Sequence, residues 1–172
     1  KFYDETLQKL ERENLIIDLR NNPGGFLEVA VDIAGQFLKG GDVVVIEDFG
    51  GAKEQDIHKA TGNSQLKDDI IVILINEGSA SASEILAGAL RDHNGATLVG
   101  MQSFGKGSVQ ELASLKAGAT LKVTVANWLT PLGAHITDVG LTPDIEVDIT
   151  EEDFDQELDP QLDKAIELIQ KL

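Results

Sequence analysis

The stretch "NEGSASASEILAGAL", residues 76–90, places serines at positions 79, 81 and 83, where an apolar run gives way to a helical pattern. Residues at such a strand–turn–helix junction lie at the carboxyl end of a sheet, where ligands commonly bind. A hydroxyl there also lies beside the free N–H groups of a helix N-terminus, which favour a developing oxyanion. The alternative is structural, because "SASE", residues 81–84, fits the capping-box pattern. Taken alone, the pattern favours a helix cap; with a base nearby, it would supply a serine nucleophile.

The base that such a serine requires is not an obvious histidine. His93 lies twelve residues after Ser81, a rise of roughly 18 Å along a continuous helix, so we expect it at the surface or the helix end. His58 and His135 have no local feature of a base. A lysine is the alternative base if burial leaves its amine neutral. Lys106 has a glycine on each side, which lets the backbone turn or approach a neighbour closely.

A phosphate-binding loop is a competing interpretation of the same lysine. The segment "GMQSFGK", residues 100–106, follows the strand-like "ATLVG" and satisfies the pattern G-x-x-x-x-G-K. However, Gly107 stands where a serine or threonine would bind magnesium, and the acidic strand "LIIDL" precedes the loop instead of following it. The sequence therefore disfavours nucleotide binding.

Composition narrows the class of protein. The 172 residues suit one domain with a real core, and a net charge of −16 argues against a nucleic-acid partner. The chain has no cysteine, and its three histidines show no metal-ligand spacing. No apolar stretch approaches the length of a membrane span, and the first residues have no secretory apolar region. Acidic residues are most frequent at 148–159, which we interpret as a solvated surface.

Periodicity and turn signals predict an α/β domain without internal repeats or linkers. A strong turn at 20–25, "RNNPGG", ends the first predicted strand. We expect helices at 4–13, 26–38, 83–93 and 159–172, and strands at 15–19, 42–48, within 50–60, and at 69–76, 96–100, 108–115 and 121–130.

Four segments occur together in a specific order: "LIIDLRNNPGG", "VILINEGSASASEILAGALRD", "GATLVGMQSFGKGSVQ" and "TPLGAHITDVGLTPDIEV". Together they closely resemble the carboxyl-terminal processing peptidases, the tail-specific serine proteases of family S41. The resemblance covers the chain from about residue 1 through the predicted tail helix. It implies a core of the crotonase and ClpP kind, in which mixed sheets and helices form repeated ββα units.

The resemblance also implies site residues. The middle serine of the cluster, Ser81, corresponds to the nucleophile, and Lys106 corresponds to the general base. Gln110 corresponds to a glutamine that orients this lysine. The backbone amides of Ala82 and of one glycine in "NNPGG", which we take as Gly24, are expected to bind the oxyanion.

The sequence also suggests roles for residues outside this set. Asp92 matches an acidic position that supports activity in some members, although a structural role is as reasonable. Ser79 and Ser83 are interpreted as structural hydroxyls in a tight turn. Trp128 and Phe104 are expected in the core more than in a substrate pocket. The segment "TPLGAHITDVGLTPD" is expected to be a structural loop and strand.

The implied reaction is serine endopeptidase cleavage of proteins near their C-termini. Lys106 would take the Ser81 proton, Ser81 would attack the peptide carbonyl, and an acyl-enzyme would form, with no metal or cofactor. The expected partners are protein or peptide C-termini, and the resemblance leaves a homo-oligomer open. Arg20 either holds the adjoining turn or lies on the surface. The alternative function is a protease-like module that binds peptides without cleaving them.

The extent of the sequence differs from the family pattern. Members usually carry an export signal, helical segments and a PDZ domain; we find none of these in the sequence, and a PDZ domain has no room before "KFYDETL". We therefore expect residues 1–172 to be an isolated protease core with a C-terminal helix at about 159–172, which leaves its activity as a fragment in question. By the same resemblance, we expect an extracytoplasmic location, in the periplasm or on the outer face of the membrane. Membrane contact would require segments that this sequence lacks.

Overall fold

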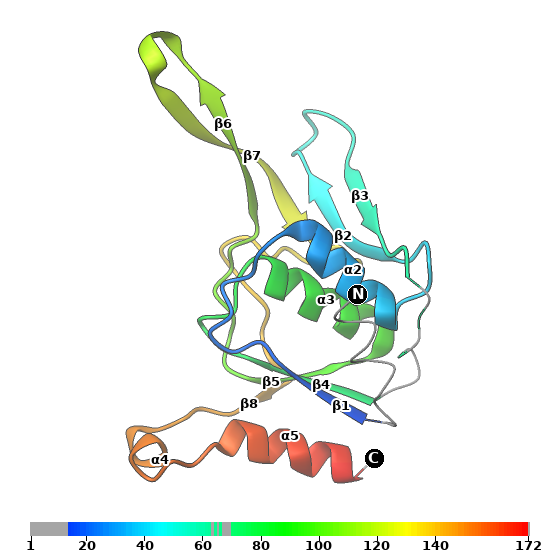
Figure 1. Ribbon diagram of the computed structural model, residues 1–172, viewed down its shortest axis with the longest axis vertical. Coiled ribbons are helices and arrows are strands. Elements are labelled where there is room, and N and C mark those ends of the chain that lie inside the picture. The colour runs from blue at the N-terminus through cyan, green and yellow to red at the C-terminus, as the bar shows by residue number, and fades with distance from the viewer. Residues whose placement is uncertain (1–13, 63, 65, 67–69, 172) are drawn as a thin grey trace.

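The computed structural model describes residues 14–62, 64, 66 and 70–171, and it places two four-stranded sheets on either side of a pair of helices (Figure 1). The predicted helix at 4–13 lies outside the described residues. The first sheet is entirely parallel and has the order β1–β4–β5–β8. Its strands are β1 (Asn14–Asp18), β4 (Ile70–Ile75), β5 (Thr97–Gly100) and β8 (Ile145–Glu146).

Strand β4 forms the centre of this sheet because apolar residues fill both of its faces. Ile71, Ile73 and Ile75 belong to the core cluster on the side of α2 and α3, whereas Val72 and Leu74 belong to a second cluster that includes α5. A parallel strand covered on both faces requires such a continuous apolar sequence. The helices are α2 (Leu27–Phe37), α3 (Ala82–Asn94), α4 (Glu151–Asp155) and α5 (Pro160–Lys171).

The second sheet is antiparallel and has the order β3–β2–β7–β6. Its strands are β2 (Val43–Asp48), β3 (Asp56–Lys59), β6 (Ser108–Ser114) and β7 (Thr120–Leu129). The hairpin of β6 and β7 projects away from the body of the molecule (Figure 1), and a short 3₁₀ turn at Lys116–Gly118 closes it. Leu112 and Leu121 on this hairpin are exposed.

The predicted α/β class is confirmed, and the predicted elements between residues 14 and 171 form in the expected order with small shifts at their ends. Three elements of the described chain were not predicted: the 3₁₀ turn at Lys116–Gly118, β8 and α4. Strand β8 is only two residues long, and α4 forms within the acidic segment that we interpreted simply as a solvated surface. Thr150 and Asp153 form a capping box that starts α4, and most of its residues are exposed. Within the described part of the chain, no helix is long and apolar enough to cross a membrane.

Candidate active site

Three loops meet at one edge of the parallel sheet because they follow three neighbouring strands. The loops at 19–26, 76–81 and 101–107 leave the carboxyl ends of β1, β4 and β5, which are adjacent in the sheet. Backbone hydrogen bonds continue the pairing into the loops, from Leu19 N to Leu74 O at 2.9 Å and from Met101 N to Ile75 O at 3.0 Å. Carboxyl ends of parallel strands are the usual place for a ligand site. The predicted Gly24, Ser81 and Lys106 lie on these three loops, one on each.

Ser81 has an unusual backbone conformation at the N-cap of α3. Its φ of 57° and ψ of −119° lie in a region that residues with a side chain rarely adopt. Such a conformation costs on the order of 1–3 kcal/mol and persists only where the surrounding structure imposes it. Here Ile85 N donates to Ser81 O at 3.0 Å and Ser81 N donates to Glu84 Oε2 at 2.7 Å. The Glu84 half of the predicted capping box is therefore present.

Glu84 joins residues 76–82, which we call the serine turn, to the loop at 101–107, which we call the lysine loop. Its side chain is buried, with 1% exposure, and accepts four hydrogen bonds. One comes from Ser81 N, and two come from Gly105 N at 2.7 Å and Lys106 N at 3.0 Å. The fourth comes from Ser103 Oγ at 2.6 Å. A carboxylate with its two oxygens saturated by donors from both loops fixes these loops relative to each other. Sequence reasoning found only the local part of this role.

The lysine loop is also held from its other side. Thr137 Oγ1 donates to Gly107 O at 2.5 Å, and Asp138 N donates to Gly105 O at 2.9 Å. A Cβ at Gly107 would lie 2.2 Å from Thr137 N, so this close approach requires glycine. The segment "TPLGAHITDVGLTPD" therefore has the structural role that we predicted.

Lys106 and Gln110 are both exposed in this structure. Lys106 lies in the loop just before β6, and Gln110 lies within β6. The burial that we required for a neutral lysine is therefore not present in the free chain.

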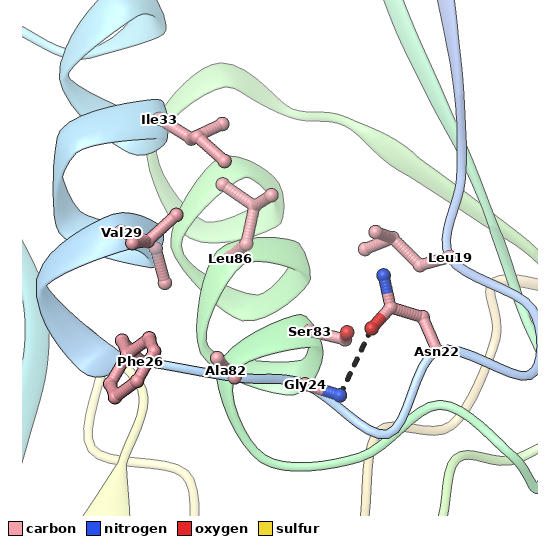
Figure 2. A pocket seen from close by; sticks show the side chains of 11 residues that line it. Leu19, Asn22, Gly24, Phe26, Val29, Ile33, Ala82, Ser83 and Leu86 are labelled. Carbon is pink, nitrogen blue, oxygen red and sulfur yellow. Dashed lines mark hydrogen bonds between the residues drawn. The ribbon is translucent and has the colours of Figure 1, made fainter.

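Gly24 packs directly on the serine turn. Its φ is +89°, and a Cβ there would lie 2.5 Å from Ala80 O and 2.7 Å from Ala82 N. The structure thus brings together Gly24 and Ala82, the two residues predicted for the oxyanion site. The Gly24 amide donates to Asn22 Oδ1 at 3.0 Å (Figure 2).

An apolar pocket opens beside these two residues. Val29 and Ile33 from α2 face Leu86 from α3 across it (Figure 2). Its volume is about 280 Å³, and none of the described residues that line it has a charged side chain. The lining residues are Leu19, Asn22, Gly24, Gly25, Phe26, Val29, Ala30, Ile33, Ala82, Ser83 and Leu86. The pocket can accept an uncharged, apolar side chain.

Several predicted residues lie away from this site or have structural roles. Asp92 lies in the last turns of α3, opposite the Ser81 end, and its Oδ2 accepts from Leu132 N at 3.0 Å. His93 is exposed at the same helix end, as predicted, and its Nε2 lies 2.7 Å from Val43 O. Ser79 Oγ donates to Leu19 O at 2.7 Å, which confirms a structural hydroxyl. Ser83 is buried, as a structural hydroxyl would be.

One of the two aromatic predictions was wrong. Trp128 is buried as expected, with 8% exposure, but Phe104 is 66% exposed. Phe104 N donates to Ser79 O at 2.9 Å, which ties the backbone of the lysine loop to the serine turn and leaves the ring outside the core.

Arg20 is the centre of a group of charged residues at this edge of the sheet. It holds the turn at 20–25 in place, which was the first of the two roles that we considered for it. Its guanidinium bridges Asp18 and Asp159, with shortest N–O distances of 2.7 and 2.8 Å. The hydrogen bonds that Arg20 donates to these carboxylates raise its pKa above the ordinary value. The Arg20 hydrogen bond lowers the pKa of Asp159. Burial acts to raise the pKa of Asp18, but its hydrogen bonds with Arg20 outweigh burial and lower it.

Two other kinds of site, a phosphate-binding loop and a metal centre, find no support among the described residues. The loop at 101–107 leads into strand β6, so it has no helix N-terminus to bind a phosphate as a P-loop does. Among the residues that the structure describes, no group of three or more His, Asp or Glu side chains is placed to hold a metal ion.

The chain is similar in sequence to a known protein family and to several of its members. The model of peptidase family S41 matches residues 1–147. A carboxy-terminal-processing protease of Bartonella bacilliformis is 46% identical over 135 residues, which are 77% of this chain and 30% of that protein. A chloroplastic C-terminal processing peptidase of Tetradesmus obliquus is 41% identical over 142 residues, or 83% of this chain and 30% of that protein. The chain thus spans about 30% of the length of these curated relatives.

Solved structures agree with the sequence relatives. The photosystem II D1 C-terminal processing protease superposes with a TM-score of 0.72 and 36% identity, over 86% of this chain and 37% of that one. Mature CPAF, at 16% identity and a TM-score of 0.68 over 86% of this chain and 41% of that one, shares the fold. A family match that runs through all three loops, together with relatives above 40% identity, shows that this chain belongs to peptidase family S41.

Proposed function

We propose that this chain carries the peptide-cleaving centre of a serine endopeptidase that acts near the C-termini of proteins. In this proposal Ser81 is the nucleophile, Lys106 is the general base, and Gln110 orients the lysine. The amides of Ala82 and Gly24 bind the oxyanion of the tetrahedral intermediate, as backbone donors do in other acyl-transfer sites, and the Gly24 amide must first leave Asn22 Oδ1, to which it donates in the free chain. Lys106 takes the Ser81 proton during attack and returns it to the leaving amine, and water then releases the acyl-enzyme.

The observation that carries this proposal is the shared carboxylate of Glu84. It accepts from the amides of both Ser81 and Lys106, at 2.7 and 3.0 Å, although these residues are far apart in sequence. A serine in a strained conformation at a helix N-terminus, fixed to a lysine loop, fits nucleophilic catalysis better than helix capping alone. The Lys106 side chain is exposed, so a bound peptide would have to cover it, and the loss of water would then favour its neutral form.

The pocket beside Ala82 supports a particular class of peptide. Its position next to the oxyanion amides suits the side chain that precedes the scissile bond. Because the lining residues that the structure describes are uncharged, we propose that this side chain is apolar. The names of the relatives describe C-terminal processing, and this is the basis for proposing protein C-termini as substrates. An extracytoplasmic location is proposed on the family resemblance alone.

Fluorophosphonate labelling followed by mass spectrometry tests the proposed centre. We expect an adduct on Ser81 that is absent from Ser81→Ala, together with cleavage of an unstructured peptide that ends in apolar residues. Lys106→Ala should slow labelling by at least about 100-fold, in the range of general-base contributions. Lys122→Ala is the matched control, because it removes an exposed lysine from the hairpin and should label as the wild type does.

The outcomes separate catalysis from binding alone. A folded wild type that binds the peptide but neither labels nor cleaves would instead support the non-catalytic peptide-binding module. Labelling of Ser81 that Lys106→Ala leaves unchanged would remove Lys106 from the proposed mechanism while keeping Ser81 as a nucleophile.

A further inference from the structure

Asp159, which directly precedes the C-terminal helix, binds Arg20 in the loop at 19–26, which we call the oxyanion loop. Arg20 NH1 donates to Asp159 Oδ1 at 2.8 Å, and Arg20 NH2 donates to Asp159 Oδ2 at 2.9 Å. The Arg20 side chain is only 14% exposed, and its Nε and NH2 groups also donate to Asp18. A two-point contact between a planar guanidinium and a carboxylate fixes orientation as well as distance. We call this contact between Arg20 and Asp159 the clamp.

Asp159 is itself fixed in place. It directly precedes α5, and its Oδ1 accepts from Leu162 N at 3.0 Å, as an N-cap residue does. Gln161, which is 2% exposed, accepts from Arg20 NH1 at 3.2 Å and donates to Val147 O at 2.7 Å. The clamp therefore belongs to a helix start that is anchored against the edge of the parallel sheet.

From Arg20 the contacts lead directly to the proposed oxyanion site. Asn21 has a φ of 54°, and its amide donates to Asn76 Oδ1 at 2.8 Å. Ala80, the neighbour of Ser81, donates its amide to Asn22 O at 3.0 Å, and Asn22 Oδ1 in turn accepts from Gly24. The loop is thus held by the serine turn on one side and by α5 on the other.

We propose that Asp159 is a positioning residue for the oxyanion loop. Asp159 acts through Arg20 to hold Gly24 against Ala82. This inference rests on the proposed function of Gly24 and Ala82. It makes the start of the C-terminal helix part of the framework of the active site, because a donor contributes to catalysis only when its position is fixed beforehand.

The test compares two ways of weakening the same helix. Asp159→Asn removes the charge and one acceptor from the clamp. Leu162→Ala removes apolar packing between α5 and the sheet but keeps the backbone amide that Asp159 caps. Asp159→Glu restores a carboxylate that can reach Arg20. Hydrogen exchange of a peptide that covers residues 19–25 reports the loop without any need for catalysis.

We expect faster exchange of residues 19–25 in Asp159→Asn, near-normal exchange in Leu162→Ala, and recovery in Asp159→Glu. Fluorophosphonate labelling of Ser81 should slow on the order of tenfold in Asp159→Asn, less than the loss on removal of a whole oxyanion donor. In peptide cleavage the change should appear in kcat and leave KM nearly unchanged.

Equal exchange of the loop in Asp159→Asn and Leu162→Ala, when both are folded, would overturn the positioning role. A wild type that never labels would refute the proposed function, and the exchange comparison would still decide the clamp. Slower labelling in Asp159→Asn without faster loop exchange would also count against it, because the effect would not then pass through the loop.

Discussion

At the scale of single residues, Gly24 and Gly25 form a natural comparison because they are neighbours with opposite surroundings. A Cβ at Gly24 would lie within 2.7 Å of two backbone atoms of the serine turn, and its φ is positive. A Cβ at Gly25 would meet nothing within 4 Å. We expect Gly24→Ala to lower the free energy of unfolding by about 3 kcal/mol, the sum of overpacking and backbone strain. Gly25→Ala should change it by less than about 0.5 kcal/mol.

Urea unfolding of the two variants measures this difference. Gly24→Ala should also lose most of the Ser81 labelling, because the turn must shift to admit the methyl group. Equal stability of the two variants would mean that Gly24 does not press on the serine turn as the structure has it.

The residue-level predictions were confirmed where the signal was local, whereas the roles that the family motifs imply remain proposals. The motifs assigned Ser81, Gly24 and Lys106, and the structure places them on three adjacent loops. The capping box predicted that Glu84 binds the Ser81 amide. It could not predict the donors from Ser103, Gly105 and Lys106, because these come from a distant segment that only the sheet brings near. Phe104 was wrongly expected in the core because hydrophobicity alone does not say which side of a loop faces the core.

At the scale of elements, α2 determines the character of the pocket. Val29 lines it from the first turns of α2 and is 43% exposed, so a polar side chain there can be solvated. We expect Val29→Asp to favour substrates with Lys or Arg before the scissile bond, because the carboxylate would pair with their charge. The ratio of kcat/KM for basic over apolar peptides should rise roughly three- to tenfold, as a partly exposed ion pair allows.

Matched peptides that differ only in that one residue provide the measurement. Asp32→Asn is a suitable control, because Asp32 is exposed on the same helix, outside the pocket. An unchanged preference in Val29→Asp would show that this pocket does not hold the side chain before the scissile bond.

Most elements were predictable because their periodicity is strong, but their arrangement was not. The apolar run of β4 and the amphipathic α5 could be read from sequence, as could the turn at 20–25. The division of the strands between two sheets depends on pairing between distant segments, such as β1 with β4 and β2 with β7. Strand β8 has too few residues for a period, and α4 depends on a cap within an otherwise acidic run.

At the scale of the whole molecule, the clamp makes the free energy of unfolding depend on pH. The pKa values of Asp18 and Asp159 are both lowered in the folded chain. A lowered carboxyl pKa contributes stability above the ordinary value of about 4, and this contribution is lost as pH falls through the lowered folded pKa. We therefore expect Asp159→Asn to be less stable than the wild type at pH 7, and we expect this difference to shrink as the pH falls below about 4.

Urea unfolding at several pH values checks this expectation, with the difference between the two proteins as the quantity of interest. This difference removes the general effect of the net charge of −16, which both chains share almost equally. A difference that persists unchanged into strong acid would mean that Asp159 stabilises the fold by something other than its charge.

The two oxygens of Glu84 have a consequence for how the site can open. Because they accept from the amides of Ser81, Gly105 and Lys106, neither loop can move away without breaking hydrogen bonds to the carboxylate that also holds the other loop. We therefore expect Ser81 and Lys106, the proposed nucleophile and base, to belong to a single cooperative unit with one opening free energy. A thermal fluctuation would dismantle the whole centre at once, and half-assembled forms, with an ordered serine beside a disordered lysine loop, would be rare.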